Sequence, residues 1–525
     1  MKQTFRKTKV VAAGALCGAL AFAGTTSAVA AGTEPPQSGP AVEVPGAPAQ
    51  AIAPASIPVG GVSGVWGEVS WQIDEAGVLE IGPGHLFDQM DMSQGWRVYS
   101  DDITKVVFTG PDPTILAEDS SELFQNMYLV TEFEGLENVD ASQVRTLANA
   151  FSSLLALQTL DLSSWDTSSL QDLSFTFAGS FALTSLDVST WNTSNVTSLF
   201  ATFAACEALV DLDISNWNVG QVQSMNITFL HANSLEELDL SNWNPAQNYS
   251  LSGTFSEMAS LRSLNLAGWD LSNVTDLASM AANTPSLETL DLSGWDTRHI
   301  FSSSLMLQDS AVSTLILGEN TVLSLFSDLR DLAADDVFTG NWVEIGSGTV
   351  DEPRESSWEG TSSDLLTRTQ DVREAGTYVL QRHITVEFDA NHPDATGSVA
   401  AVTGRTGFPV LIPANEFEAA DYTFNGWNLA ADGTSTPFSV GESAYFGGGT
   451  TTVFAQWVPV DVDPDPEPEP SPTPDPDEKP EDKPKDSENK DLAQTGASGL
   501  WLGLVALGLL GLGAGATVWS RRRAS

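Results

Sequence analysis

Few residues of this chain have the types and spacing that catalysis requires. The motifs HExxH, GxSxG and GxxxxGK, which serve zinc proteases, serine hydrolases and nucleotide-binding loops, do not occur in the sequence. The five histidines show no spacing that suits metal ligands; they are His85, His231, His299, His383 and His392. Cys206 is equivalent, in a repeat described below, to Ser180, Ala232 and Met258, which favours a packed core thiol over a nucleophile. We therefore predict no catalytic residue, no metal site and no cofactor.

One set of carboxylates is regular enough to form a binding surface. An aspartate recurs with a period of 26 residues, interrupted once by Asn265; we call this set the acidic strip, and it comprises Asp161, Asp187, Asp213, Asp239 and Asp291. On stacked strands such residues lie about 4.8 Å apart, where like charges repel one another. The strip is either a docking site for a basic partner, or a solvated face whose aspartates hydrogen-bond to neighbouring serines.

The overall charge excludes one class of partner. The chain has 69 acidic and 22 basic residues, a formal net charge of -47 and an isoelectric point near 4.1. Between Gln125 and Leu317 there is no lysine, and the only arginines are Arg145, Arg262 and Arg298. Nucleic-acid binding needs clustered Lys and Arg, so we predict no nucleic-acid partner. An acidic field of this kind favours solubility and basic partners.

The residues that position the acidic strip repeat with the same period. Six tryptophans fall 26 residues apart without a slip: Trp165, Trp191, Trp217, Trp243, Trp269 and Trp295. A fixed period of this length is typical of a solenoid, in which each unit buries its apolar face against its neighbours. The tryptophans are most simply explained as a ladder of core residues, although sugar stacking is an alternative.

One copy of the repeat predicts the structure of a coil. Leu157, Leu160, Leu162 and Trp165 give the spacing LxxLxLxxW, in which alternation directs the leucines inward and Asp161 outward. An Asx residue follows each tryptophan and can cap a turn; the six are Asp166, Asn192, Asn218, Asn244, Asp270 and Asp296. The apolar residues Leu170, Leu173 and Phe177 then recur at helical spacing. We therefore predict an α/β repeat, with a strand and a helical or 3₁₀ segment in each coil.

This pattern resembles the BspA-type leucine-rich repeats of bacterial surface proteins. The resemblance covers roughly Phe124–Leu317, and the element LDLSxW[DN]T is intact at Leu160–Thr167. It differs from common LxxLxLxxN repeats because a tryptophan stands where the asparagine would be, with the Asx one place later. The resemblance implies a leucine-rich-repeat solenoid at residues 124–317 and a surface location, with adhesive partners as an expectation.

Both ends of the chain carry sequences typical of export. Residues 1–30 have a basic start, an apolar run and the small residues Ala28, Val29 and Ala30, which predict a secretory signal peptide. At the other end, Leu492, Ala493, Gln494, Thr495 and Gly496 precede an uncharged, mostly apolar segment, 499–519, and three arginines. This arrangement at 492–525 resembles the LPxTG sorting signal of Gram-positive surface proteins, in its LAxTG form. It implies that sortase cleaves between Thr495 and Gly496 and joins the threonine to the peptidoglycan precursor.

The remaining segments complete the predicted domain order. They are a flexible leader at 31–64, β-rich caps at 65–123 and 318–383, a second module at 384–458 and a linker at 459–491. The second module resembles a Listeria-Bacteroides repeat, a small β-grasp-like domain, through its aromatic strands around Phe424, Trp427 and Trp457; an independent β-rich spacer predicts the same pattern. The linker alternates prolines with aspartates and glutamates, which predicts a stiff, extended tether.

Together these features predict a cell-wall-anchored bacterial surface protein that is not an enzyme. We expect its solenoid to act as an adhesin or interaction module, with a host protein, a glycan or another bacterial surface as ligand. Two alternatives are a structural stalk without a specific ligand and a wall-associated hydrolase whose site is not recognisable. The membrane would be contacted only through the transient C-terminal segment.

Overall fold

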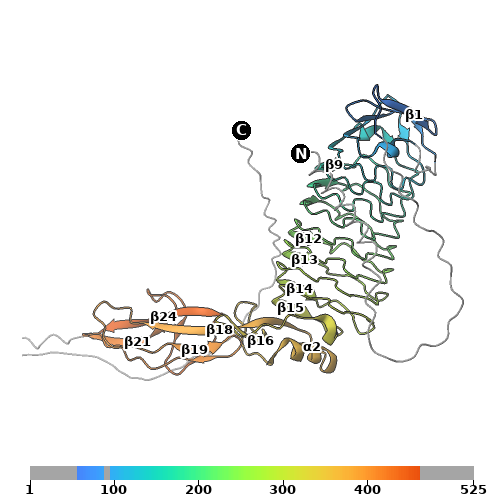
Figure 1. The fold of residues 1–525 in the computed structure, drawn as a ribbon. Helices are drawn as coiled ribbons and strands as arrows, with labels where there is room; N and C mark the ends of the chain where they lie inside the picture. Colours follow the sequence, from blue (N-terminus) through green and yellow to red (C-terminus); the bar gives the residue numbers. More distant parts are fainter. Residues whose placement is uncertain (1–55, 88–94, 461–525) are drawn as a thin grey trace, which may run out of the picture. The chain divides into compact units, whose positions relative to one another are not determined.

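The computed structural model describes residues 56–87 and 95–460, which form a β-solenoid followed by a strand-rich module (Figure 1). The predicted signal peptide, most of the leader, most of the linker and the sorting signal lie outside these residues. Among the residues that the structure describes, no helix is both long and apolar enough to cross a membrane.

The N-terminal part changes from antiparallel to parallel pairing. One sheet has the order β1 (Val62–Trp66), β2 (Val69–Ile73), β3 (Val78–Ile81), β5 (Lys105–Phe108) and β7 (Glu132–Glu134). The first three strands pair antiparallel, and β3, β5 and β7 pair parallel. A second, parallel sheet contains β4 (Gly84–His85), β6 (Thr114–Ile115) and β8 (Val139–Asp140). Two 3₁₀ segments, η2 (Trp96–Tyr99) and η3 (Leu136–Asn138), lie between these strands.

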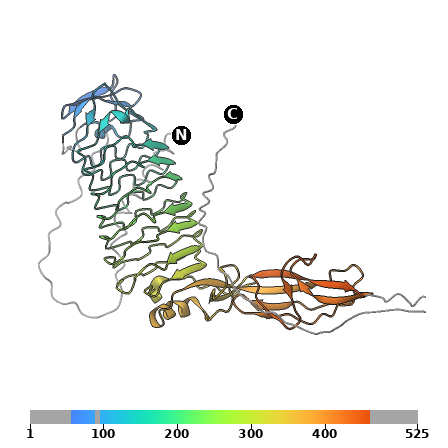
Figure 2. The same cartoon turned by 180° about the vertical axis from the view of Figure 1, so that it is seen from behind.

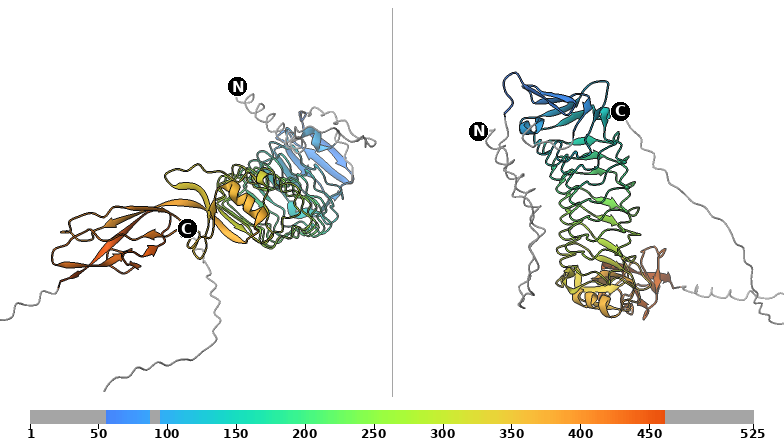
Figure 3. Two further views of the ribbon diagram at one scale, coloured as in Figure 1. Left: turned by 90° about the horizontal axis from the view of Figure 1, so that it is seen from below. Right: turned by 90° about the vertical axis from the view of Figure 1, so that its right-hand side faces the viewer.

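The solenoid coils then contribute one short strand each. These are β9 (Thr159–Asp161), β10 (Ser185–Asp187), β11 (Asp211–Leu212), β12 (Glu237–Asp239), β13 (Ser263–Asn265), β14 (Thr289–Leu292) and β15 (Thr314–Leu317). Pairing is parallel, and Leu160 lies opposite Leu186, which holds the equivalent position in the next coil, as the period requires. A second line of parallel bridges joins other points of consecutive coils, for example Thr146 with Asp172. Figure 2 shows strands along one edge of the stack and loops along the other, and the right panel of Figure 3 shows the coils one above another.

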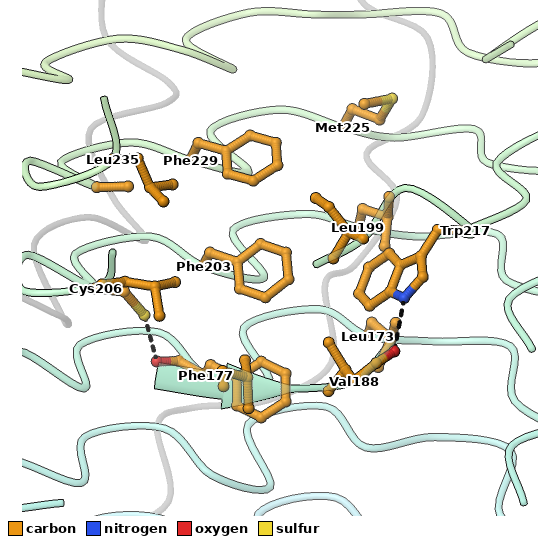
Figure 4. Packing of buried hydrophobic residues seen from close by; sticks show 14 of the residues in the cluster. Leu173, Phe177, Val188, Leu199, Phe203, Cys206, Trp217, Met225, Phe229 and Leu235 are labelled. Carbon is orange, nitrogen blue, oxygen red and sulfur yellow. Dashed lines mark hydrogen bonds between the residues drawn. The ribbon is translucent and has the colours of Figure 1, made fainter. Parts of the chain in front are cut away.

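Two aromatic columns run through the core of the solenoid. Trp191 and Trp217 stack with ring centroids 6.2 Å apart and planes 2° from parallel. Phe177 and Phe203, from another segment of the coil, stack with ring centroids 5.8 Å apart and planes 4° from parallel. The columns lie close together, because the centroid of Phe203 is only 5.7 Å from that of Trp217 (Figure 4). The core is therefore continuous from coil to coil, which a repeat without disulfides needs for stability.

The predicted helical segment is wrong, and with it the α/β description of the repeat. After Leu173 the backbone forms turns, and two residues of each coil have positive φ, such as Phe175 at 57° and Gly179 at 72°. An α-helix requires φ near -63° at consecutive residues. The amide of Phe177 instead donates to the carbonyl of Thr202 in the next coil, at 3.0 Å. The apolar periodicity of this segment reflects burial. Its amides alternate between bonds to the next coil and bonds to the carbonyl three residues earlier, such as Ala178 to Phe175 at 3.1 Å, so the segment is a series of turns.

The parallel ladder ends where an antiparallel strand covers it. β15 pairs with β18 (Gly376–Asp389), which also pairs with β16 (Phe338–Glu344). Along the sequence, η4 (Leu325–Ser327) lies between β15 and β16, and β17 (Glu359–Gly360) and α2 (Ser362–Asp371) lie between β16 and β18. The helix α2 begins with a capping box, in which Thr361 and Asp364 each accept from the other's backbone amide, and it buries Leu365 and Leu366.

The second module has its own hydrophobic core. Its strands are the end of β18, β19 (Val402–Arg405), β20 (Val410–Leu411), β21 (Tyr422–Asn428), β22 (Pro437–Phe438), β23 (Ser443–Ala444) and β24 (Gly449–Pro459). β24 lies between β18, with which it is parallel, and β21, with which it is antiparallel. Ile384, Val386, Trp427 and Val453 are among the buried residues of a cluster separate from the solenoid core. The β-grasp-like assignment of this module stays a prediction.

Candidate functional site: the acidic strand face of the solenoid

The five aspartates of the acidic strip are exposed at the ends of the solenoid strands. Asp161 lies directly opposite Asp187 in the pairing of β9 with β10. Asp239 lies opposite Asn265 in the pairing of β12 with β13. Asp213 follows β11 by one residue, and Asp291 lies within β14. The ladder is interrupted between β11 and β12 and again between β13 and β14. The strip therefore divides into one group of three, Asp161, Asp187 and Asp213, followed by Asp239 alone and Asp291 alone.

Each of these aspartates also closes a turn. One carboxylate oxygen accepts a hydrogen bond from the backbone amide two residues later, at 2.9–3.1 Å in all five copies. In three copies the serine hydroxyl at that position donates to the same oxygen, as Ser163 does to Asp161 at 2.6 Å. Asn265 makes the equivalent bond to Ala267 at 3.2 Å, which shows that an uncharged acceptor suffices for the turn.

These hydrogen bonds lower the pKa of three aspartates of the strip. The side-chain and backbone bonds from Ser163 hold the pKa of Asp161 below its ordinary value. Ser215 and Ser241 lower the pKa of Asp213 and Asp239 in the same way. A carboxylate that accepts such bonds is favoured in its charged form. The turn uses one oxygen of each aspartate, so the negative charge stays at the surface.

A second acidic position on this face was missed by the sequence analysis. Asp211 and Glu237 are exposed and lie two residues before Asp213 and Asp239. Alternation along a strand directs residues i and i+2 to the same face, and this was the signal that could have found them. Glu236 precedes Glu237 and contacts Arg262, an exposed pair separated by 4.0 Å. Negative charge is therefore most concentrated where β11 gives way to β12.

The six tryptophans of the ladder lie in the core, with exposed fractions of 1–3 %. Four of them use the indole N–H to reach the backbone carbonyl of the preceding coil; for example, Trp191 donates to Leu162 at 3.0 Å. Rings that are buried and hydrogen-bonded in this way offer no face to a sugar. The alternative explanation of the tryptophans as a glycan platform is therefore wrong.

The other chemistry-bearing residues do not assemble with the strip. Cys206 is buried, and its thiol donates to the carbonyl of Phe177 at 3.2 Å (Figure 4). His231 contacts Glu257 at 3.3 Å, away from the strand ends. Within 56–87 and 95–460, no three His, Cys, Asp or Glu side chains are grouped so that they could hold a metal ion. The sorting motif Leu492–Gly496 and the apolar segment after it lie outside the described residues.

Comparison with protein families gives one match. A family model described as a Mycoplasma protein of unknown function, DUF285, matches residues 118–238 and again residues 198–315. The two overlapping matches cover the coils, so this part of the chain is similar to that family. No curated protein matches the chain. The match supports the repeat solenoid, and the family's description assigns no activity.

Proposed function

We propose that this protein is a cell-wall-anchored surface protein without enzymatic activity, whose solenoid binds a basic partner through the acidic strand face. The surface location and the wall anchoring in this proposal depend on the BspA-type, Listeria-Bacteroides and sorting-signal resemblances of the sequence. The observation that carries the binding role is the row of exposed carboxylates at Asp161, Asp187, Asp211, Asp213 and Asp239. Between Arg145 and Arg298 the sequence has one arginine, Arg262, and no lysine, so few positive charges compensate these acids.

Rigidity of the stacked coils supports a recognition role. The carboxylates are placed by short strands, Asx turns and a buried aromatic ladder, so little conformational entropy is lost when a partner binds. Rows of like charge on a rigid surface accelerate association with an oppositely charged partner. We expect this partner to be a basic protein on a host or bacterial surface.

One observation favours the stalk as a second candidate function. All five aspartates of the strip accept a hydrogen bond that closes their own turn, so their recurrence is explained even if no partner binds them. A stalk would display other parts of the chain and would have no saturable ligand. The two functions predict different effects of removing charge from this face while the turns are kept: partner binding weakens only if the strip is the binding site.

The test is a substitution that removes charge and keeps the turn. Asp213→Asn with Asp239→Asn retains the acceptor oxygen, as Asn265 does in its own coil. The matched control is Asp166→Asn with Asp270→Asn, which removes the same charge from the turns that follow the tryptophans, where other copies already have asparagine. Full-length wild type and both variants are tested for saturable binding to purified extracellular-matrix proteins and intact bacterial cells, at two salt concentrations.

Binding through the strip predicts that the Asp213/Asp239 variant loses at least about tenfold in affinity and that salt weakens the wild type. The Asp166/Asp270 variant should bind as the wild type does. Equal affinities of both variants for a saturable partner would overturn the role of the strip, and the absence of any saturable partner would favour the stalk.

A further inference from the structure

The second module contains an aromatic cleft that the acidic strip does not explain. The cleft has a volume of about 620 Å³ and opens where β21 begins and β24 ends. Its walls include four aromatic side chains and its rim two carboxylates; these are Phe417, Tyr422, Phe424, Trp457, Asp394 and Glu418. We refer to it as the aromatic cleft.

Strand register brings three of the rings together. Tyr422 and Phe424 are two residues apart on β21 and therefore project from the same face. Phe424 lies directly opposite Trp457 on β24. Trp457 continues the row of Val453 and Ala455, both fully buried in the module's core. The cleft is thus the place where this core reaches the surface, and Tyr422 is 38 % exposed there.

The rings of the cleft do not form a flat platform. The planes of Phe424 and Trp457 meet at 76°, with centroids 5.9 Å apart. The indole N–H of Trp457 donates to the carbonyl of Ala390 at 2.7 Å, which fixes the orientation of the ring. His392 packs 4.7 Å from Tyr422 at 54° and supports it from the side. A sugar ring prefers to stack on one exposed aromatic plane, whereas a compact cation can be surrounded by several ring faces.

The rim is held in place by its own backbone contacts. Thr396 and Glu418 exchange two amide-to-carbonyl hydrogen bonds, each of 2.9 Å, which join the two loops that carry the carboxylates. Gly397 has φ of 94°, and a Cβ there would lie 2.2 Å from the carbonyl oxygen of Glu416, so only glycine allows this approach. Asn415 accepts from the amide of Phe417 at 3.0 Å and donates to its carbonyl at 2.9 Å. The cleft is therefore preorganised.

The charges around the aromatic cleft favour a positively charged ligand. Asp394 and Glu418 are exposed at the rim, and no Lys or Arg is among the residues that line the cleft. An anionic ligand would meet two carboxylates without a compensating cation. A positively charged group gains both from the carboxylates and from the negative faces of the aromatic rings.

From these observations we propose that the aromatic cleft binds an alkylammonium group, such as a quaternary ammonium headgroup or a lysine side chain. The methylene or methyl groups contact Phe417, Phe424 and Trp457, and the charge lies between Tyr422 and the two rim carboxylates. The proposal concerns a site separate from the acidic strip, and it holds or fails independently of the proposed function of the solenoid.

The experiment measures binding of small probes to the full-length protein by ligand-observed NMR and calorimetry. Tetramethylammonium and N-acetyl-lysine amide represent the two sources of the cation; glucose and acetate represent a sugar and an anion. The variant Tyr422→Leu removes the ring, and Tyr422→Phe retains it. Glu418→Gln removes a rim charge, and Glu387→Gln is its matched control, because Glu387 is an exposed carboxylate of β18 outside the cleft.

We expect at least one ammonium probe to bind, and affinity to fall about fivefold or more in Tyr422→Leu and in Glu418→Gln. Tyr422→Phe and Glu387→Gln should retain wild-type affinity. Preference for tetramethylammonium or for the lysine derivative identifies the source of the group. Binding of glucose in place of the cations, binding of neither ammonium probe, or equal losses in Glu418→Gln and Glu387→Gln would overturn the proposal.

Discussion

The indole N–H of Trp217 donates to the backbone carbonyl of Val188, in the preceding coil, at 3.2 Å (Figure 4). The bond joins two consecutive coils through a side chain, next to the stacking of Trp217 on Trp191 and Trp243. It favours tryptophan at the four positions where the bond forms, because phenylalanine would fill part of the space but could not donate to the preceding coil. Each tryptophan of the inner coils therefore contributes both apolar burial and a hydrogen bond between repeats.

The first prediction separates those two contributions. Trp217→Phe loses the hydrogen bond and some volume, whereas Trp295→Phe loses only volume, because the indole nitrogen of Trp295 has no hydrogen-bond partner among the described residues. Both rings are buried. We expect Trp217→Phe to lower the free energy of unfolding by about 1 kcal/mol more than Trp295→Phe. Denaturant unfolding of the two variants measures the difference, and an equal or larger loss in Trp295→Phe would contradict this explanation.

The second prediction concerns like charges on consecutive coils. Glu237 and Asp211 occupy equivalent exposed positions of neighbouring coils, at the point where the strand ladder is interrupted. Glu237→Gln should raise the free energy of unfolding by about 0.5 kcal/mol at low salt, because it removes a repulsion. The gain should shrink at high salt, where surface charges are screened. Glu207→Gln, an exposed change outside this face, is the control, and the idea fails if both variants respond alike.

The period of the coils could be predicted from sequence because burial repeats with it. Leu160 and Trp165 mark the strand and the corner of a coil, and both are buried in the structure. The turn backbone could not be predicted, because positive φ occurs at Phe175, Ala201 and Ile227, which carry none of the usual glycine or asparagine signals. Hydrogen bonds to the next coil hold these residues in that conformation. Their cost is offset by contacts that exist only once the coils have stacked.

The site was partly predictable for a similar reason. The exposure of Asp161 and its equivalents follows from alternation, which is a local property of the chain. The aromatic cleft depends on Phe424 meeting Trp457 across the pairing of β21 with β24, although β22 and β23 lie between these strands in the sequence. Sequence periodicity holds no information about that pairing. The second module was therefore predicted as a β-grasp-like domain or a β-rich spacer with aromatic core residues, and not as a ligand site.

The third prediction tests the anchoring that the sequence implies. Thr495→Ala removes the residue that sortase would join to peptidoglycan. We expect the wild type to leave the wall only after muramidase digestion and the variant to be extracted by detergent without digestion. Gln494→Ala, a change at the variable position of the motif, is the control and should stay attached. Wall attachment of Thr495→Ala equal to that of the wild type would show that anchoring does not use this bond.

The fourth prediction follows from the lowered pKa values of Asp161, Asp213 and Asp239, whose main cause is hydrogen bonding from Ser163, Ser215 and Ser241. A carboxyl group whose pKa is lower in the folded state stabilises the fold above its unfolded pKa of about 3.9, and this contribution is lost as the pH falls through the folded pKa.

The wild type should therefore lose stability as the pH falls below about 5 and through the folded pKa values of these aspartates. Protonation also relieves repulsion in a chain of net charge -47, which acts in the opposite direction. A triple Asp→Asn variant at these positions keeps the turns but cannot titrate there. The difference in acid stability between the wild type and this variant therefore measures the contribution of the hydrogen-bonded carboxylates. Thermal unfolding as a function of pH should show a steeper acid loss in the wild type than in the variant. Parallel curves would mean that these turns contribute no pH-dependent stability.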